Sequence, residues 1–174
     1  AWADAKSEYN IGIGNYVMDA VMNGATYNTA IGDAALTALT SGDQNISLGA
    51  ASMTATTSGS YNISMGVSSL ESNVSSNHNT AIGHSAGSTS TGAKNTFIGS
   101  TTRASASDGA NQIAIGYNEV GYSDGFASIG GTVLGLNVPN TMSSPYYRFD
   151  GSNDEVAVAD NAHMSFGYTT YDTP

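Results

Sequence analysis

The sequence predicts an all-β chain built as a β-solenoid, or β-roll, of about eight coils that are each 16 to 18 residues long. Three observations support this fold class. A five-residue motif recurs at nearly constant spacing, the residues within each motif alternate with period two, and glycines recur too often for a stable helix. Each coil is therefore expected to hold a short strand, a tight turn, a second short segment and another turn.

The motif consists of Asn, a variable residue, a residue that is small in all but one copy, a large aliphatic residue and Gly. Two variant copies begin with Gln112 and Phe126. The other copies occupy residues 10–14, 28–32, 45–49, 62–66, 79–83 and 95–99. Successive closing glycines are separated by 18, 17, 17, 17, 16, 17 and 14 residues. Such regular spacing indicates stacked copies of one structural unit.

Alternation within the motif separates two faces of the expected strand. We expect the large aliphatic residue at the fourth position to face the core in every copy: Ile13, Ile31, Leu48, Met65, Ile82, Ile98, Ile115 and Ile129. The third residue is small except at Phe97, and we expect it to face away from the core and to pack closely against a neighbouring surface.

The ends of the motif and the segment between motifs complete each coil. The leading Asn fits a turn or a stacked ladder of side chains, and the closing Gly fits a backbone that needs positive φ. Four residues after that Gly stands a second large apolar residue, at Met18, Leu36, Met53 and Leu70.

A coil of about 17 residues encloses little core, so coils must bury their apolar residues against one another. Because the small-residue face is expected to pack against other chains, the sequence predicts a homotrimer, intertwined or packed around a common axis.

The run Tyr27–Gly42, YNTAIGDAALTALTSG, resembles the repeats of trimeric bacteriophage tail and head fibres. It is also similar, with longer coils, to the head repeats of bacterial trimeric autotransporter adhesins. The resemblance covers about residues 9 to 130. The longer coils and the lack of heptads favour the viral fibre.

The resemblance implies a structural role in the virion: a rigid trimeric spacer that joins other virion proteins and presents a receptor-binding module for host attachment. The alternative is the head of a bacterial trimeric surface adhesin, at the cell surface, which binds host matrix or carbohydrate. No enzyme activity is expected under either interpretation.

The chain is expected to divide into an N-terminal connector (1–8), the solenoid (9–131), a linker or neck (132–145) and an incomplete module (146–174). The module resembles the beginning of a laminin-G or concanavalin-like lectin sandwich, through the segments 149–152, 155–159 and 161–166. This resemblance implies that a host cell-surface glycan or protein binds there.

Composition excludes other classes of function. Four Lys and Arg residues against 14 Asp and Glu residues give a formal net charge of −10, which opposes binding to nucleic acid or to an anionic membrane. No apolar run approaches the roughly 18 residues of a membrane span. The chain has no Cys, so it has neither a disulfide framework nor a Cys-based zinc site.

The sequence predicts no catalytic, cofactor-binding or metal-binding residues. Scattered carboxylates without a repeated offset indicate a solvated acidic surface: Asp4, Glu8, Asp19, Asp33, Asp43 and Glu71. A calcium site in the C-terminal module is a weaker alternative to a turn at Asp150, Asp154 and Glu155. We expect hydrogen bonding, not metal binding, from His78, His84 and His163.

Three tyrosines, Tyr9, Tyr27 and Tyr61, each directly precede a motif Asn. Register alone predicts that they lie on one edge of the solenoid and stack as a structural ladder. A glycan-binding aromatic stripe is the weaker alternative.

Overall fold

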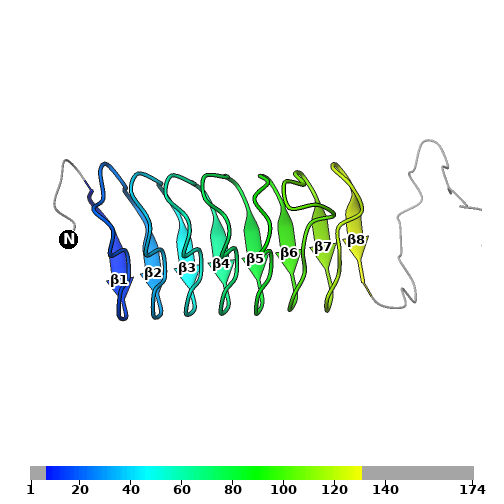
Figure 1. Ribbon diagram of the computed structural model, residues 1–174, viewed down its shortest axis with the longest axis horizontal. Coiled ribbons are helices and arrows are strands. Elements are labelled where there is room, and N and C mark those ends of the chain that lie inside the picture. Colours follow the sequence, from blue (N-terminus) through cyan, green and yellow to red (C-terminus); the bar gives the residue numbers. More distant parts are fainter. Residues whose placement is uncertain (1–6, 131–174) are drawn as a thin grey trace, which may run out of the picture. The chain divides into compact units, whose positions relative to one another are not determined.

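The computed structural model describes residues 7–130, which form a parallel β-solenoid (Figure 1). Each copy of the motif contributes one three-residue strand. The strands are β1 (Ile11–Ile13), β2 (Thr29–Ile31), β3 (Ile46–Leu48), β4 (Ile63–Met65), β5 (Thr80–Ile82), β6 (Thr96–Ile98), β7 (Ile113–Ile115) and β8 (Ala127–Ile129). The predicted all-β solenoid of about eight coils is confirmed. The linker and the lectin-like module lie outside the described residues.

The strands pair in chain order, so that each motif lies beside the next one along the axis. In the first pair Ile11 faces Thr29, and the same motif positions face one another in every later pair. Backbone bonds between coils continue beyond the strands. Leu36 N–H, for example, donates to the Ser52 carbonyl at 3.1 Å. Stacked coils are therefore held together by hydrogen bonds on the strand side and along the second segment.

The side chains of each strand face the opposite way from the sequence prediction. The small middle residues point inward and are fully buried, as at Ala30, Ser64 and Ala81. The large aliphatic residues point outward, and Ile31 and Ile82 are each 39% exposed. The predicted burial of the large aliphatic residues is thus wrong, and so is the prediction that the small residues face away from the core and pack against other chains. The reason is space: in so small a coil, the inner side of the strand lies close to the opposite segment and admits only a small residue where that segment carries Met or Leu.

In the first four coils, the second large apolar residue forms the core instead. Met18, Leu36, Met53 and Leu70 are fully buried and occupy equivalent positions in successive coils. They belong to one cluster with the small inward residues of the strands. Large residues of the second segment, to which Met22 and Leu39 also belong, and small residues of the strands therefore fill the interior together.

One coil reverses this division of volume. Phe97 stands where other strands carry a small inward residue, and it is fully buried. Gly87 stands where the four preceding coils carry Met or Leu, and a Cβ at Gly87 would lie 2.6 Å from Phe97 Cδ2 and 2.9 Å from Leu70 Cδ2. The phenyl ring thus fills the space that the missing side chain leaves. The large residue at Phe97 therefore compensates for the missing side chain at Gly87.

The motif asparagines form the predicted ladder inside the solenoid. Asn45 N–H donates to Asn28 Oδ1 at 2.9 Å, and Asn62 N–H donates to Asn45 Oδ1 at 3.0 Å. Asn45 Nδ2 also donates to the Gly59 carbonyl of its own coil at 2.8 Å. Each side chain therefore joins a strand to the next coil and closes the turn that leads back to the strand.

The ladder runs from Asn10 to Gln112. It has one flaw among the described residues: Asn79 Nδ2 is buried without an acceptor. In four other coils the acceptor carbonyl lies 14 residues after the Asn. The coil from Gly83 to Gly99 is one residue shorter than the common step of 17, which alters the turn that would supply the acceptor for Asn79.

The closing glycines have the positive φ that the sequence predicts in seven copies, for example +140° at Gly49. Close packing also requires them, since a Cβ at Gly49 would lie 2.5 Å from the Gly66 carbonyl oxygen. Other positions adopt left-handed backbone without glycine, including Tyr27, Gln44 and Leu36. The coil geometry imposes these conformations against the local preference of L-residues.

The ladder predicts a strong effect of Asn45→Ala. The substitution leaves the buried Asn62 N–H and the Gly59 carbonyl without partners, and each loss costs about 1–3 kcal/mol. We expect the free energy of unfolding to fall by about 2–6 kcal/mol in urea titrations. The exposed neighbour supplies the control, Gln44→Ala, which should change stability by less than about 0.5 kcal/mol. Equal effects of the two substitutions would contradict the ladder.

The volume exchange predicts coupling between two sites. Phe97→Ala should destabilise the chain by about 3–5 kcal/mol because it leaves a cavity. Gly87→Leu alone should also destabilise it, since the new side chain meets the ring. The double variant restores the pattern of the four preceding coils, so it should be more stable than the sum of the single effects allows. Strict additivity in urea titrations would refute the exchange.

Candidate functional site

The outward side of the sheet is the most extensive candidate surface. We define the outward face as the first and third residues of strands β1 to β8. All sixteen of these residues are uncharged, and most are Ile. Many remain exposed although they are large and apolar: Ile11, Ile13, Ile31, Ile46, Ile82, Ile98, Ile113 and Ile129. A continuous apolar strip of this kind is the signature of a binding surface.

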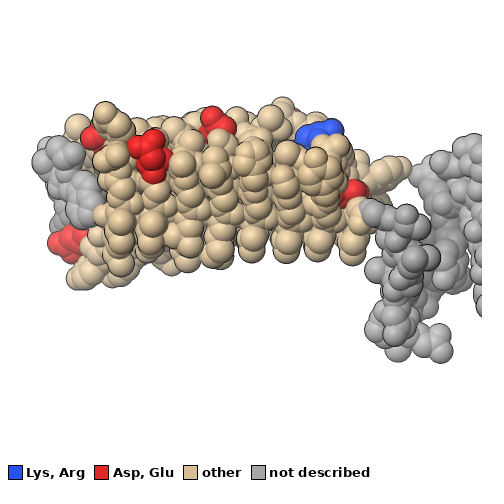
Figure 2. Space-filling model, turned by 90° about the horizontal axis from the view of Figure 1, so that it is seen from below, with Lys and Arg blue, Asp and Glu red and all other residues tan. Residues whose placement is uncertain are grey.

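The charged residues are distributed differently. Figure 2 shows one side of the solenoid, on which the charged side chains lie near one long margin and at the ends, while a broad band across the coils carries no charge. Residues 7–130 hold eight Asp and Glu residues against two Lys and Arg residues, and these charges are not spread evenly over the side that Figure 2 shows. Uncharged bands of this kind are available for contact with another acidic chain.

The residues that precede each motif form a second row along the sheet. The rings of Tyr9 and Tyr27 stack at 4.8 Å, and those of Tyr61 and His78 stack at 4.9 Å. The predicted aromatic stacking is confirmed for Tyr9 and Tyr27, and Tyr61 stacks on a histidine. Gln44 lies between these two pairs in the row.

The interruption at Gln44 coincides with a surface hollow of about 440 Å³. Tyr27 and Thr29 line it from one coil, and Gln44 and Ile46 line it from the next. Because Thr29 and Ile46 belong to the outward face, the aromatic row borders this face on one side. The hollow is thus a notch in the margin of the apolar strip.

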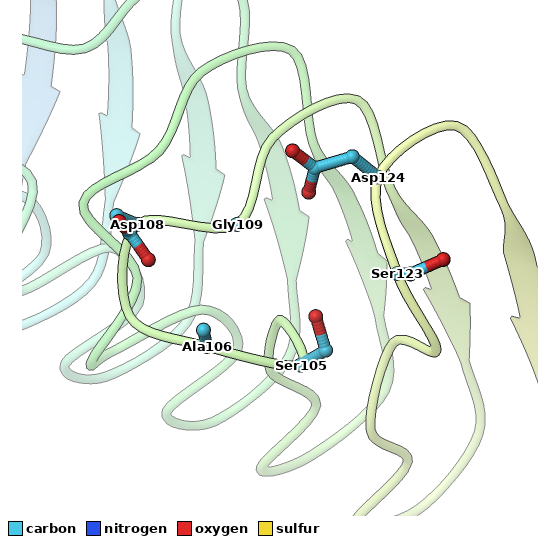
Figure 3. Close-up of a pocket in the computed structure, with 6 residues that line it drawn as sticks. All are labelled: Ser105, Ala106, Asp108, Gly109, Ser123 and Asp124. Atoms are coloured by element: carbon cyan, nitrogen blue, oxygen red, sulfur yellow. The ribbon is translucent and has the colours of Figure 1, made fainter.

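A polar hollow of about 520 Å³ lies near the last coils (Figure 3). Asp108 and Ser105 contribute to it from one coil, and Asp124 and Ser123 contribute from the next. Both carboxylates line the same hollow, although no pair was predicted from the sequence. Asp124 Oδ1 accepts hydrogen bonds from Ala110 N–H and Gln112 Nε2, both at 2.9 Å.

These hydrogen bonds connect Asp124 to the preceding coil. The hydrogen bond from Gln112, followed by that from Ala110 N–H, lowers the pKa of the Asp124 carboxyl below its usual value. The group is therefore ionised at neutral pH and is a poor proton donor. Asp43 makes an equivalent contact, since its Oδ1 accepts from Thr26 N–H at 2.7 Å and from Thr26 Oγ1 at 2.8 Å.

The carboxylates of Asp43 and Asp124 thus join adjacent coils by hydrogen bonds, a role that was not predicted from the sequence. A small or acceptor-bearing residue two positions before each motif Asn was the available signal, as in Asp43, Ser60 and Asn77. Among residues 7–130 no group of three His, Asp or Glu side chains could hold a metal ion. Asp4, Asp150, Asp154, Glu155 and His163 lie outside the described residues.

No helix within residues 7–130 is long and apolar enough to cross a membrane. No family model matches the chain, and comparisons with curated proteins and with solved structures found no significant match.

Titration of Asp124 gives a prediction in acid. The pKa of Asp124 is lower in the folded chain, so the hydrogen bonds that its carboxylate accepts stabilise the fold above about pH 4. This stabilisation is lost as the pH falls through the folded-state pKa. Asp124→Asn keeps an acceptor oxygen but does not titrate. We therefore expect the wild type to lose thermal stability relative to Asp124→Asn as the pH falls from about 5 to about 2. If thermal stability falls equally with pH in the two chains, the stabilising role of the Asp124 carboxylate is contradicted.

Proposed function

We propose that this chain is a rigid spacer segment of a viral fibre, which holds a receptor-binding module away from the virion for host attachment. The observation that carries the proposal is the uninterrupted stacking of eight coils, joined by backbone bonds and by the asparagine ladder. The described surface offers no metal cluster, and the carboxylate of Asp124 is engaged in structural contacts. These features suit a mechanical role.

A solenoid of this kind resists bending because every coil contacts both of its neighbours around the circumference. Eight strands at about 4.8 Å give a length of about 34 Å between the first strand and the last. Each added coil would extend the segment by the same step and contribute the same contacts. Length is thus set by the number of repeats, as a spacer requires.

A second candidate function is the head of a bacterial surface adhesin, in which the solenoid itself binds carbohydrate or host matrix. The aromatic row and the hollow at Tyr27 favour this candidate, because exposed aromatic rings stack on sugar rings. The row has a sufficient structural explanation in its stacking register, so the spacer remains the proposal.

Coil duplication tests the spacer. A chain in which residues 33–66 are repeated carries two extra coils and should gain about 10 Å in maximum dimension by small-angle X-ray scattering. Its thermal midpoint should equal or exceed that of the original chain, because the added coils bring the same neighbour contacts. An unfolded product, or an unchanged dimension, would refute a spacer of additive coils.

Removal of aromatic rings separates the two candidate functions. Tyr27→Ser and Tyr61→Ser should leave binding to a glycan array and to bacterial cells unchanged if the solenoid is a spacer. A loss of binding in these variants, with unchanged circular dichroism, would favour the adhesin head. Tyr117→Ser serves as the control because Tyr117 is exposed and does not precede a motif.

A further inference from the structure

The chain contains a single Asn-Gly pair, Asn23 and Gly24, in the turn that leads from the second segment of the first coil to strand β2. Asn23 is exposed. In such a pair the backbone nitrogen of the glycine can attack the side-chain carbonyl carbon of the asparagine, because no Cβ on the glycine blocks the approach. The restraint that the fold places on this nitrogen therefore decides whether the pair reacts.

The backbone of Asn23 occupies the same position in the first coil as Thr40 in the second. Asn23 N–H donates to the Thr40 carbonyl at 2.6 Å, as Thr40 N–H donates to the Thr57 carbonyl at 2.9 Å. Gly24 therefore corresponds to Ser41, and its nitrogen can be compared with those of the following coils.

The nitrogen of Gly24 is bound differently from its equivalents. Ser41 N–H and Ser58 N–H each donate to a backbone carbonyl of the next coil, at 3.0 Å and 3.4 Å. Gly24 N–H donates instead to the side-chain hydroxyl oxygen of Ser7, at 3.2 Å. A serine hydroxyl can turn away by rotation about its side chain, whereas a carbonyl within a stacked coil cannot. Rotation of one side chain therefore releases the Gly24 nitrogen.

The space around Gly24 is open. A Cβ at Gly24 would meet no atom within 4 Å. At Gly42 and Gly59, in the turns of the next two coils, a Cβ would lie 2.2 Å and 2.7 Å from a backbone carbonyl oxygen. The Asn23 side chain and the Gly24 nitrogen can therefore approach each other without displacing a neighbouring coil.

Other candidate pairs among residues 7–130 lack this combination. Motif asparagines such as Asn45 are buried and precede no Gly, and their amides are bonded in the ladder. Two aspartates precede a glycine, but both glycine nitrogens donate to backbone carbonyls. These bonds run from Gly109 to Ala106 at 3.1 Å and from Gly125 to Asn111 at 3.0 Å.

We propose that Asn23 and Gly24 form a site of spontaneous covalent modification, at which the folded chain cyclises to a succinimide and then opens to isoaspartate or aspartate. A bond forms between Gly24 N and Asn23 Cγ, and the bond between Asn23 Cγ and Nδ2 breaks. The proton of Gly24 N–H leaves with Nδ2 as ammonia. Water then opens the imide: attack at Cγ gives aspartate, and attack at the main-chain carbonyl carbon gives isoaspartate. The reaction needs no oxidant, reductant or cofactor.

The product changes the first coil in two ways. Isoaspartate carries the main chain through the former side chain and adds a methylene group beside the hydrogen bond from Asn23 N–H to the Thr40 carbonyl. Each product also adds a negative charge to a chain whose formal net charge is −10. Modification therefore loosens the first coil against the second and produces a more acidic chain with age. The proposed spacer function does not depend on this reaction.

Incubation of the full chain at neutral pH, followed by peptide mapping with mass spectrometry, tests the site. Isoaspartate is identified by methyl transfer from an isoaspartyl methyltransferase. We expect residue 23 to react faster than the exposed Asn118 by a factor of about ten, which corresponds to about 1.4 kcal/mol in activation free energy. Equal rates at the two residues would overturn the proposal. Reaction of Asn23 in urea but not in the folded chain would overturn it as well.

Two threonine variants provide matched controls. Asn23→Thr introduces the residue that Thr40 and Thr57 supply in the following coils, so this variant should fold and should lose the acidic species that forms at this turn. Asn118→Thr removes another exposed asparagine and should leave that species unchanged on ion exchange. If Asn23→Thr becomes acidic as fast as the wild type, the reaction lies elsewhere and the proposal is wrong.

Hydrogen exchange tests the consequence for the first coil. Ala20 N–H donates to the Thr37 carbonyl of the second coil at 2.9 Å, and in the modified chain this amide should exchange faster than in the unmodified chain. The amide of Met53, which joins the third coil to the fourth, should keep its rate. Unchanged exchange at Ala20 in a chain that carries isoaspartate would refute the loosening.

Discussion

The whole structure depends on hydrogen bonds that run between coils, above all on the buried amides of the motif asparagines. Asn28, Asn45 and Asn62 accept a backbone N–H from the following coil while their own amide groups close the turn within the coil. A buried amide that bonds on both sides fixes the register of each strand relative to the next one. The sixteen outward residues are therefore free to serve contacts outside the chain.

Space inside the coil explains which sequence predictions succeeded. Repeat length and period-two alternation predicted the strands, the ladder and the glycine conformations, because these follow from local pattern. Alternation shows that two faces differ but does not say which one is inside. Hydrophobicity suggested Ile82, whereas the narrow interior accepts Ala81 and already holds Leu70. The second large apolar residue of the first four coils, at Met18, Leu36, Met53 and Leu70, was the sequence signal that other side chains already fill the core.

For contacts that depend on turn geometry, the sequence shows a recurring acceptor-bearing position but not the group that this acceptor meets. The carboxylates of Asp43 and Asp124 face backbone N–H groups of the preceding coil only because the turns bring them there. The exchange between Gly87 and Phe97 likewise requires knowledge of which positions meet across the coil. Of the candidate surfaces, the aromatic row followed from register alone, while the outward face appeared only once the direction of the strand side chains was known.

Native-state hydrogen exchange of the full chain tests the central role of the buried ladder most directly. The backbone N–H groups of Asn45, Asn62 and Asn79 each donate to the side-chain oxygen of the preceding motif asparagine. If the ladder holds the coils together, these amides exchange in the slowest class and at one common rate, because they open only when the solenoid unfolds. Exchange as fast as that of exposed turn amides, or at widely different rates in adjacent coils, would contradict the account.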